Sequence, residues 1–330
     1  MAQSNGKKVL VTGAGGFIGR FLCRRLADAG YGITALAMPK EDSAFLEDMG
    51  AKVVLGDITD PKTLAGIGDG MDVVYHLAAR VTDYGTWDQF YKPIYHGTKN
   101  VLEACAGKSS RFVYLSSICA YGTGRHLKGL KESDPVIRTN IPYNDAKQDA
   151  EIQVLSCNDR FKRGCTVVRP ANVIGPGSIW VAEVGRMFQK SSVPLFDQGR
   201  YSASLIYIDN LVEGIILAGT ADQAAGQTYN LRDDWQVTWK QYLTNLSAML
   251  GKRPIGNLPF KLAWVLGGFV EKICNPLGLR PFITRHTVGL MGRDNDVDTS
   301  KAKTELGWRT RISYQEAMKE IEKWIEQNMR

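Results

Sequence analysis

The hydrophobic pattern of the first half of the chain alternates between short apolar runs and stretches with apolar residues at helical spacing. Short runs rich in valine, isoleucine and leucine are typical of strands that are buried on both faces. Such runs lie at 9–11, 33–37, 52–55, 72–79, 111–115 and 166–170. Strands that alternate with helices predict an α/β fold with a doubly wound parallel sheet.

The pattern changes after Gly175-Pro176-Gly177, where helical spacing becomes dominant. Only short apolar runs at 204–207 and 228–231 interrupt it. We predict a first domain over 1–175 and a smaller, mostly helical C-terminal substrate lobe over 176–330, with 205–225 returning to the first domain. The predicted helices are 17–26, 87–105, 142–155, 180–189, 209–218, 239–250, 258–273 and 313–327, and 122–140 is a polar loop.

The first predicted strand leads into a glycine-rich turn and then into a helix. Gly13, Gly16 and Gly19 stand at the spacing of a dinucleotide-binding turn. In such a turn one glycine allows the sharp bend, one lets the backbone approach a pyrophosphate, and one lets the helix pack on the strand. The free N–H groups of the helix N-terminus then bind the phosphates. The alternative is a glycine-rich turn in an unrelated α/β protein.

The residues after the second strand bear on the type of cofactor. An acidic residue at the strand end would bind the ribose 2′-hydroxyl of NAD, but the chain continues Met38-Pro39-Lys40. Lys40, Ser43 and the nearby Arg20 suit a 2′-phosphate instead. NADP is therefore slightly favoured over NAD, and a solvated loop lysine is the alternative.

Two other strand ends carry candidate ligand contacts. Asp57 follows the third strand, where it either bonds an adenine amino group or caps a helix before Pro61. Ala78 and Ala79 end the fourth strand, and small side chains at a carboxyl edge leave room for a ligand. His76 lies inside the apolar run, which favours a structural role.

A tyrosine, a lysine and a serine form the candidate catalytic group. Tyr143 and Lys147 are one helical turn apart, so their side chains share a face. An ammonium beside a phenol favours the phenolate and lowers its pKa, which suits a general acid/base for an alcohol proton. Ser117, at the end of the fifth strand, can hold the same substrate oxygen. An ordinary amphipathic helix also produces the tyrosine–lysine spacing.

Composition adds mainly exclusions. The 330 residues are 44% hydrophobic and 23% charged with a net charge of +7, which is ordinary for a globular enzyme, and no nucleic-acid motif is present. The six cysteines form no C-x-x-C pair and are expected to be reduced core residues. Neither a signal peptide nor a membrane span of about 20 apolar residues is visible. We expect a cytoplasmic protein without a metal site or a nucleic-acid partner.

Six motifs occur in the order found in extended short-chain dehydrogenases/reductases of the NAD-dependent epimerase/dehydratase type. The chain resembles this superfamily over nearly its whole length, through TGAGGFIG, HLAA, YLSSICAYG, YNDAK, RPANVIGPG and IYIDN. The resemblance implies a Rossmann domain with NAD(P), Tyr143 as acid/base, Lys147 as ribose ligand and Ser117 as the group that orients the substrate oxygen. Ser117 is preferred to Ser116 because the catalytic hydroxyl usually lies four residues before the tyrosine of a Tyr-Gly pair, here Tyr121.

The resemblance also implies a set of cofactor contacts: Gly13, Gly16, Phe17, Ile18, Gly19, Lys40, Asp57, Ile58, Leu77, Ala78, Ala79, Tyr143, Lys147, Pro170, Asn172 and Val173. At two positions the sequence departs from the motifs of the family. Ile94 replaces an asparagine that many members carry before the Gly-Thr-x-Asn motif. Ala203-Ser204-Leu205 replaces the Arg-Asp-Phe of nucleotide-sugar enzymes, so that Arg200 or Arg293 would have to bind a substrate diphosphate.

The segment RPFITRHTV before DVDTSKA is similar to the 3β-hydroxysteroid dehydrogenase-like branch, which acts on apolar alcohols and ketones. We therefore expect an oxidoreductase that interconverts a secondary alcohol and a ketone on a largely apolar, steroid-like or other hydrophobic small molecule. The alternatives are a nucleotide-sugar epimerase or dehydratase that transfers hydride transiently to bound NAD, and a non-catalytic cofactor sensor.

The predicted helix 258–273 combines a broad apolar face with surrounding basic residues. Such a helix either lies on the inner face of an anionic membrane, packs on the domain, or forms a subunit contact. The resemblance further implies a homodimer through helices of the sheet domain.

Overall fold

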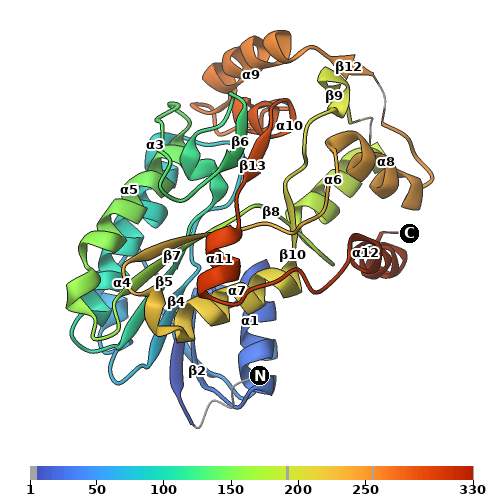
Figure 1. Ribbon diagram of the computed structural model, residues 1–330. Coiled ribbons are helices and arrows are strands. Elements are labelled where there is room, and N and C mark those ends of the chain that lie inside the picture. The colour runs from blue at the N-terminus through green and yellow to red at the C-terminus, as the bar shows by residue number, and fades with distance from the viewer. Residues whose placement is uncertain (1–5, 191–192, 255, 330) are drawn as a thin grey trace.

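The central element is a seven-stranded parallel sheet with strand order β11-β7-β5-β4-β1-β2-β3 (Figure 1). The computed structural model describes residues 6–190, 193–254 and 256–329. The strands are β1 (Lys8–Thr12), β2 (Gly32–Ala37), β3 (Lys52–Leu55), β4 (Val73–His76), β5 (Arg111–Leu115), β7 (Cys165–Pro170) and β11 (Gln227–Leu231). The chain order reverses between β1 and β4, and a parallel sheet binds its ligand at the carboxyl edge beside such a switch.

Helices cover both faces of this sheet (Figure 1). The helices α1 (Phe17–Asp28) and α7 (Ile208–Thr220) pack together on one face, and α4 (Gly97–Cys105) and α5 (Pro142–Ser156) pack on the other. Alternate strand residues explain the two layers, because Val9 and Val11 join one buried cluster and Leu10 joins the other. The predicted doubly wound Rossmann-type sheet is confirmed.

The C-terminal lobe is mostly helical, as expected, and lies beyond the carboxyl edge of the sheet (Figure 1). Its helices are α6 (Ile179–Lys190), α8 (Trp239–Met249), α9 (Phe260–Cys274), α10 (Arg285–Met291) and α12 (Tyr314–Asn328). Three parallel pairs of short strands lie outside the central sheet: β8 (Asn172–Ile174) with β10 (Leu205–Tyr207), β9 (Leu195–Phe196) with β12 (Asn257–Leu258), and β6 (Leu127–Leu130) with β13 (Asn295–Val297). The last of these pairs joins the sheet domain to the C-terminal lobe.

Two sequence-based assignments are corrected. The stretch 122–140 is not all loop, because β6 pairs with β13; with only Leu127 and Leu130 apolar, β6 carries no alternation to detect. The run 228–231, assigned to the lobe, is part of β11 and forms the outer strand of the central sheet. The strand is buried because α11 (Ser300–Glu305) packs against it, Leu231 lies beside Gly214 of α7, and Asn230 is hydrogen-bonded to Tyr121 and Leu130.

The predicted helix 87–105 is continuous but not uniform. It consists of α3 (Trp87–Tyr91), one π-helical turn at Lys92–His96, and α4. Pro93 lies in the π turn, where its missing N–H interrupts the α-helical hydrogen bonds. The short helix α2 (Ala44–Asp48) was not predicted.

All six cysteines are free, and four of them are buried. None of the helices within the described ranges combines the length and apolarity needed to cross a bilayer.

Candidate active site

The glycine turn after β1 leaves a backbone cradle that side chains would fill. Gly13 has a φ of +68°, and a Cβ there would lie 2.8 Å from the Ala78 amide nitrogen. A Cβ on Gly19 would lie 2.1 Å from the Gly13 carbonyl oxygen, so only glycine lets α1 pack this closely on the turn. Gly16 is the N-cap of α1, and no side chain caps the helix start. The cradle therefore fits the diphosphate of a dinucleotide.

Two side chains of the first turn of α1 border the cradle. Phe17 and Ile18 are partly buried, and the Phe17 ring lies 3.3 Å from where a Cβ on Gly175 would stand. The start of α1 is thereby placed next to the end of β8. Asn172 in β8 is buried and donates its amide to the Ala203 carbonyl at 2.8 Å, while Pro170 ends β7 and Val173 is half-buried. These predicted contacts lie together at the carboxyl edge.

On the β4 side of the glycine cradle, His76 holds the neighbouring residues in place. Its ring nitrogens lie 2.7 Å from the Thr12 hydroxyl and 3.0 Å from the Thr98 hydroxyl, and burial lowers its pKa to about 3. The Thr12 hydroxyl also accepts the Ala78 amide at 3.2 Å. Leu77, Ala78 and Ala79, all partly buried, are held in this way beside the glycine turn. The predicted structural role of His76 is confirmed.

Gly97 and Asn100 hold the loop after β3. A Cβ on Gly97 would lie 2.7 Å from Ile58, and the Asn100 amide donates to the Ile58 carbonyl at 2.8 Å. Asp57 accepts from the Thr59 amide at 2.8 Å, whereas the helix that contains Pro61 is capped by Asp60. The helix-cap alternative for Asp57 is therefore wrong, and its adenine contact stays a prediction.

The turn after β2 contains an acidic side chain that the sequence analysis did not consider. Glu41 donates its amide to the Met38 carbonyl at 2.9 Å and accepts the Met38 amide at 3.2 Å. This turn brings the Glu41 carboxylate against Gly15, where a Cβ would lie 2.0 Å from it. Arg20 donates to the Gly15 carbonyl at 2.8 Å and stacks on Phe45, while Lys40 is exposed.

The three candidate catalytic side chains come together at the end of β5. Tyr143 is buried in the first turn of α5, and its phenol lies near enough to the Ser117 hydroxyl for that hydroxyl to lower its pKa. The Lys147 ammonium, one turn further along α5, donates to the Leu115 carbonyl at 2.7 Å and lies 4.7 Å from the centre of the Tyr114 ring. Ser117 and Tyr143 thus lie near each other at the carboxyl end of β5.

Burial governs the charge states of this group. It raises the pKa of Tyr143, and the neighbouring Cys119 adds to the rise, while the hydrogen bond with Ser117 lowers it. Burial also lowers the pKa of Lys147 to about 7, against the opposing influence of Glu151 and Cys119. The ammonium is therefore costly without further anionic or hydroxyl partners, which a bound dinucleotide would supply.

Ser116 points away from this site. Its hydroxyl donates to the Glu151 carboxylate in a buried pocket. Glu151 also accepts from Arg169, whose Nη2 lies 2.6 Å from Glu151 Oε2, and the guanidinium lies 4.5 Å from the centre of the Tyr121 ring. The structure therefore places Ser117, and not Ser116, beside Tyr143.

His286 is a site residue that the sequence analysis missed. It lies on α10, and its ring packs edge-on against Tyr143 with 5.4 Å between ring centres. Its Nδ1 is buried without a hydrogen-bond partner among the described residues, and burial lowers its pKa to about 4. Asp83 holds the start of α10 by accepting from the hydroxyls of Thr284 and Thr287 at 3.1 Å each. No local pattern links residues this far apart in sequence.

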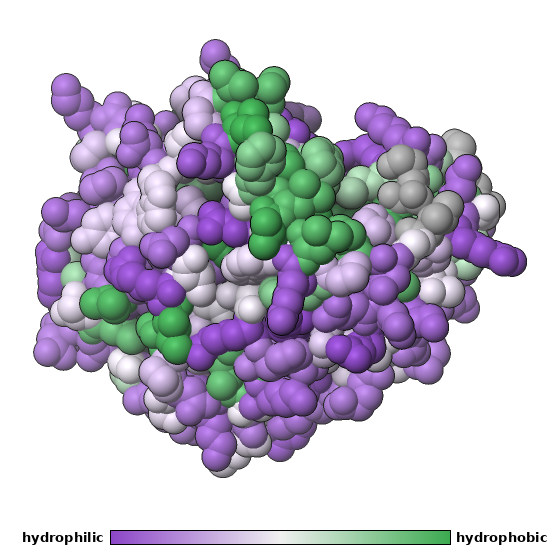
Figure 2. Space-filling view, turned by 90° about the horizontal axis from the view of Figure 1, so that it is seen from above, coloured by the Kyte–Doolittle hydropathy of each residue, from purple (hydrophilic) through white to green (hydrophobic). Residues whose placement is uncertain are grey.

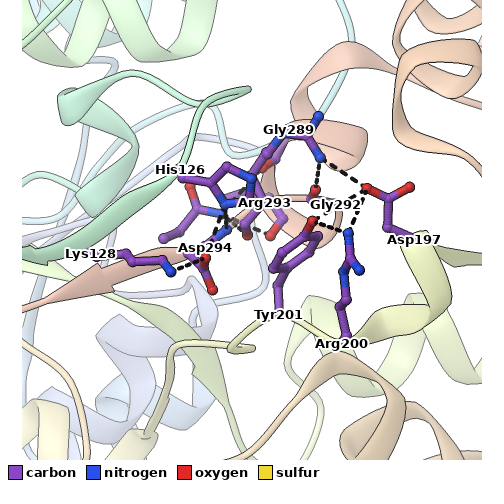
Figure 3. Close-up of polar contacts among 11 residues, drawn as sticks. His126, Lys128, Asp197, Arg200, Tyr201, Gly289, Gly292, Arg293 and Asp294 are labelled. Carbon is purple, nitrogen blue, oxygen red and sulfur yellow. Dashed lines mark hydrogen bonds and ion pairs between the residues drawn. The ribbon is translucent and has the colours of Figure 1, made fainter.

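The two arginines considered as diphosphate ligands share one carboxylate (Figure 3). Arg293 lies 3.1 Å from Asp197 and stacks on Phe260, and Arg200 lies 4.0 Å from Asp197. Asp197 also accepts the Phe260 amide at 2.8 Å, which fixes the start of α9. Both arginines therefore already have an internal partner.

Comparison with known proteins gives the same family throughout. The family model of the NAD dependent epimerase/dehydratase family matches residues 9–231. A 4-hydroxy-2-methyl-3-oxo-4-farnesyl-3,4-dihydroquinoline-1-oxide ketoreductase of Stigmatella aurantiaca is 30% identical, with 94% of each chain covered. A 2-alkyl-3-oxoalkanoate reductase of Shewanella oneidensis is 28% identical over 94% of this chain and 84% of the relative.

Two further similarities widen the range of relatives. A 3 beta-hydroxysteroid dehydrogenase/Delta 5-->4-isomerase of Mycobacterium tuberculosis is 28% identical over 95% of this chain and 89% of the relative. A UDP-glucose 4-epimerase structure from Thermotoga maritima aligns with a TM-score of 0.78 at 22% identity, covering 98% of this chain and 100% of that one, which shows a shared fold. The protein is an NAD(P)-dependent extended short-chain dehydrogenase/reductase and belongs to the NAD-dependent epimerase/dehydratase family.

Proposed function

We propose that this enzyme interconverts a secondary alcohol and a ketone on a largely apolar substrate, with Tyr143 as the general acid/base. The observation that carries the proposal is the placement of Tyr143, Ser117 and Lys147 together at the end of β5, with the glycine cradle at the same edge of the sheet. Gly13, Gly16, Phe17 and Lys147 are the residues that would hold NAD(P). When bound, that cofactor supplies the hydride acceptor or donor.

The roles of the side chains follow from where they meet. Ser117 donates a hydrogen bond to the substrate oxygen and orients it toward Tyr143. In the reducing direction the Tyr143 phenol gives its proton to that oxygen as the ketone becomes an alcohol, and in the oxidising direction the phenolate takes it back. We expect Lys147 to stabilise the phenolate through its positive charge. In the structure, burial and Cys119 raise the pKa of Tyr143, and Ser117 is the group that lowers it, so the lowering predicted from Lys147 is not seen there.

Three observations support an apolar substrate. Phe90 and His286 pack edge-on against Tyr143, so the surroundings of the reacting oxygen are aromatic. Arg200 and Arg293 share Asp197, and an arginine already bound to a carboxylate is a weak ligand for a diphosphate. The named substrates of the ketoreductase and reductase relatives carry farnesyl or alkyl groups.

A substrate panel tests the proposal against the nucleotide-sugar alternative. Purified protein is incubated with NADH or NADPH and with long-chain 3-oxo acids, steroid ketones or UDP-sugars, and absorbance of the reduced cofactor and substrate composition are followed. We expect net oxidation of one cofactor equivalent per apolar ketone reduced. Conversion of a UDP-sugar without net change in the cofactor would contradict the proposal and favour an epimerase or dehydratase.

Glu41 opposes the basic residues that favour NADP. A 2′-phosphate bound near Gly15 would meet the Glu41 carboxylate as well as Arg20 and Lys40. We expect Glu41→Gln to raise the ratio of kcat/KM for NADPH to that for NADH by about five- to ten-fold, because a repulsion of about 1 kcal/mol is removed.

The control for this variant is Glu47→Gln, which removes the same charge from the exposed first turn of α2. It should leave the cofactor ratio unchanged. An equal change in both variants would mean that net charge, and not the position of Glu41, sets the preference.

A further inference from the structure

Helix α9 is apolar on two opposite faces. Its inner face is buried against the lobe through Phe260, Ala263 and Val270. Its outer face carries four large apolar residues at helical spacing, which continue into the segment after the helix. We call the exposed set the outer ridge: Leu262, Val265, Phe269, Ile273, Leu277 and Phe282. A helix that is apolar on all sides is normally buried, so the outer ridge lacks a covering partner.

The outer ridge is the main concentration of exposed apolar side chains. Val265 is 70% exposed, Phe269 is 64% exposed and Phe282 is 76% exposed. Figure 2, which looks down on the end of the molecule where α9 lies, shows a continuous hydrophobic band there, bordered by hydrophilic residues. Contiguous apolar patches of this kind mark interaction sites in soluble proteins.

The exposed charges within the ridge segment are basic. Between residues 252 and 282 these side chains are Lys252, Arg253, Lys261, Lys272 and Arg280, of which Arg280 is paired with Glu183 at 2.6 Å. The acidic residue of this stretch, Glu271, is buried and paired with Arg285 at 2.7 Å. Lys261 and Lys272 directly flank ridge residues at the two ends of α9, and neither has an ion pair within the described parts of the chain. The surface therefore complements a partner that is both apolar and anionic.

We propose that the outer ridge is a docking surface for an anionic lipid bilayer, with α9 lying in the plane of the membrane interface. Apolar side chains enter the acyl region while Lys261 and Lys272 contact the lipid headgroups. A second copy of the chain fits less well. A twofold contact through the same face would bring Lys261 and Lys272 of both copies together without an acidic residue to pair with them.

The position of α9 relates docking to the active site. Its inner face packs on α10, and α10 carries His286, which contacts Tyr143. The helical cover of the reacting groups is therefore the part of the molecule that would face the lipid. A largely apolar substrate dissolved in the bilayer would meet the enzyme on this side, a consequence that rests on the proposed function, whereas docking itself does not.

Vesicle co-sedimentation of the full chain tests docking. We expect the protein to sediment with vesicles of phosphatidylcholine and phosphatidylglycerol, to bind phosphatidylcholine vesicles weakly, and to dissociate in high salt. The Val265→Ser/Phe269→Ser variant should bind the anionic vesicles at least about ten-fold more weakly. Lys261→Glu/Lys272→Glu should also weaken binding. The matched control is Ile152→Ser, which removes an apolar side chain that is 63% exposed on α5; it should bind like wild type.

Three results would overturn the proposal. The first is wild-type protein that stays in the supernatant with both kinds of vesicle, and the second is ridge variants that bind as wild type does. The third is light scattering that shows a dimer which Val265→Ser/Phe269→Ser converts to a monomer, because a second copy would then cover the ridge. Reduction of a water-soluble ketone by the ridge variants is measured in parallel without lipid. If turnover of the soluble ketone is unchanged in the ridge variants, a loss of vesicle binding reflects docking and not the proposed activity.

Discussion

Replacement of Tyr143 by phenylalanine should lower kcat by about 10²–10⁴-fold while leaving the affinity for the dinucleotide unchanged. The phenol is the group positioned by Ser117 to exchange a proton with the substrate oxygen. The ring itself is kept in the variant, so its packing against Phe90 and His286 is preserved. Turnover of the best ketone from the substrate panel and cofactor binding by fluorescence titration measure the two quantities separately.

The matched control is Tyr75→Phe. Tyr75 is also fully buried, and its hydroxyl has no hydrogen-bond partner among the described residues. It lies on β4 against Gly219 of α7, on the other face of the sheet. This variant should fold and turn over like wild type. If Tyr143→Phe kept most of its activity, Tyr143 would not be the acid/base, and a cofactor sensor would become the better explanation.

The sequence was most informative where one local segment carries the whole signal. The glycine turn could be predicted because the strand, the three glycines and the helix are contiguous, and the structure shows that side chains at Gly13 and Gly19 would clash with Ala78 and with the turn itself. The placement of Tyr143 and Lys147 on one face of α5 follows from helical spacing alone. In both cases backbone geometry fixes the relation between the residues.

Contacts that depend on tertiary folding could not be predicted from local sequence patterns. The interpretation of the cofactor site considered Lys40 and Ser43 but not Glu41, yet the turn that follows β2 bends back and brings Glu41 to Gly15. His286 reaches Tyr143 only because α9 and α10 fold over the sheet edge. The apolar and basic residues of 258–273 were visible in the sequence, but which apolar face is buried depends on tertiary packing. The pattern therefore left membrane, core and subunit contacts as open alternatives.

Loss of one partner of the buried ion pair behind the active site should strongly destabilise the sheet domain. We expect Glu151→Ala to lower the free energy of unfolding by about 3–5 kcal/mol, because it leaves the Arg169 guanidinium buried without its carboxylate. A typical domain has only about 5–15 kcal/mol of stability in total. Urea unfolding followed by tryptophan fluorescence measures the loss.

A double-mutant cycle identifies the cause of this loss. In Glu151→Leu/Arg169→Leu both charges are absent, so no unpaired charge remains in the core, and the double variant should be more stable than either single variant. Additive losses would show that the two side chains contribute separately. Ser116→Ala, which removes a hydroxyl donor to the same carboxylate, should lower the free energy of unfolding by only about 1 kcal/mol.

Glu151 lies one turn from Lys147 and raises the pKa of Lys147. Loss of Glu151 should therefore also weaken cofactor binding near neutral pH, because Lys147 would more often be uncharged.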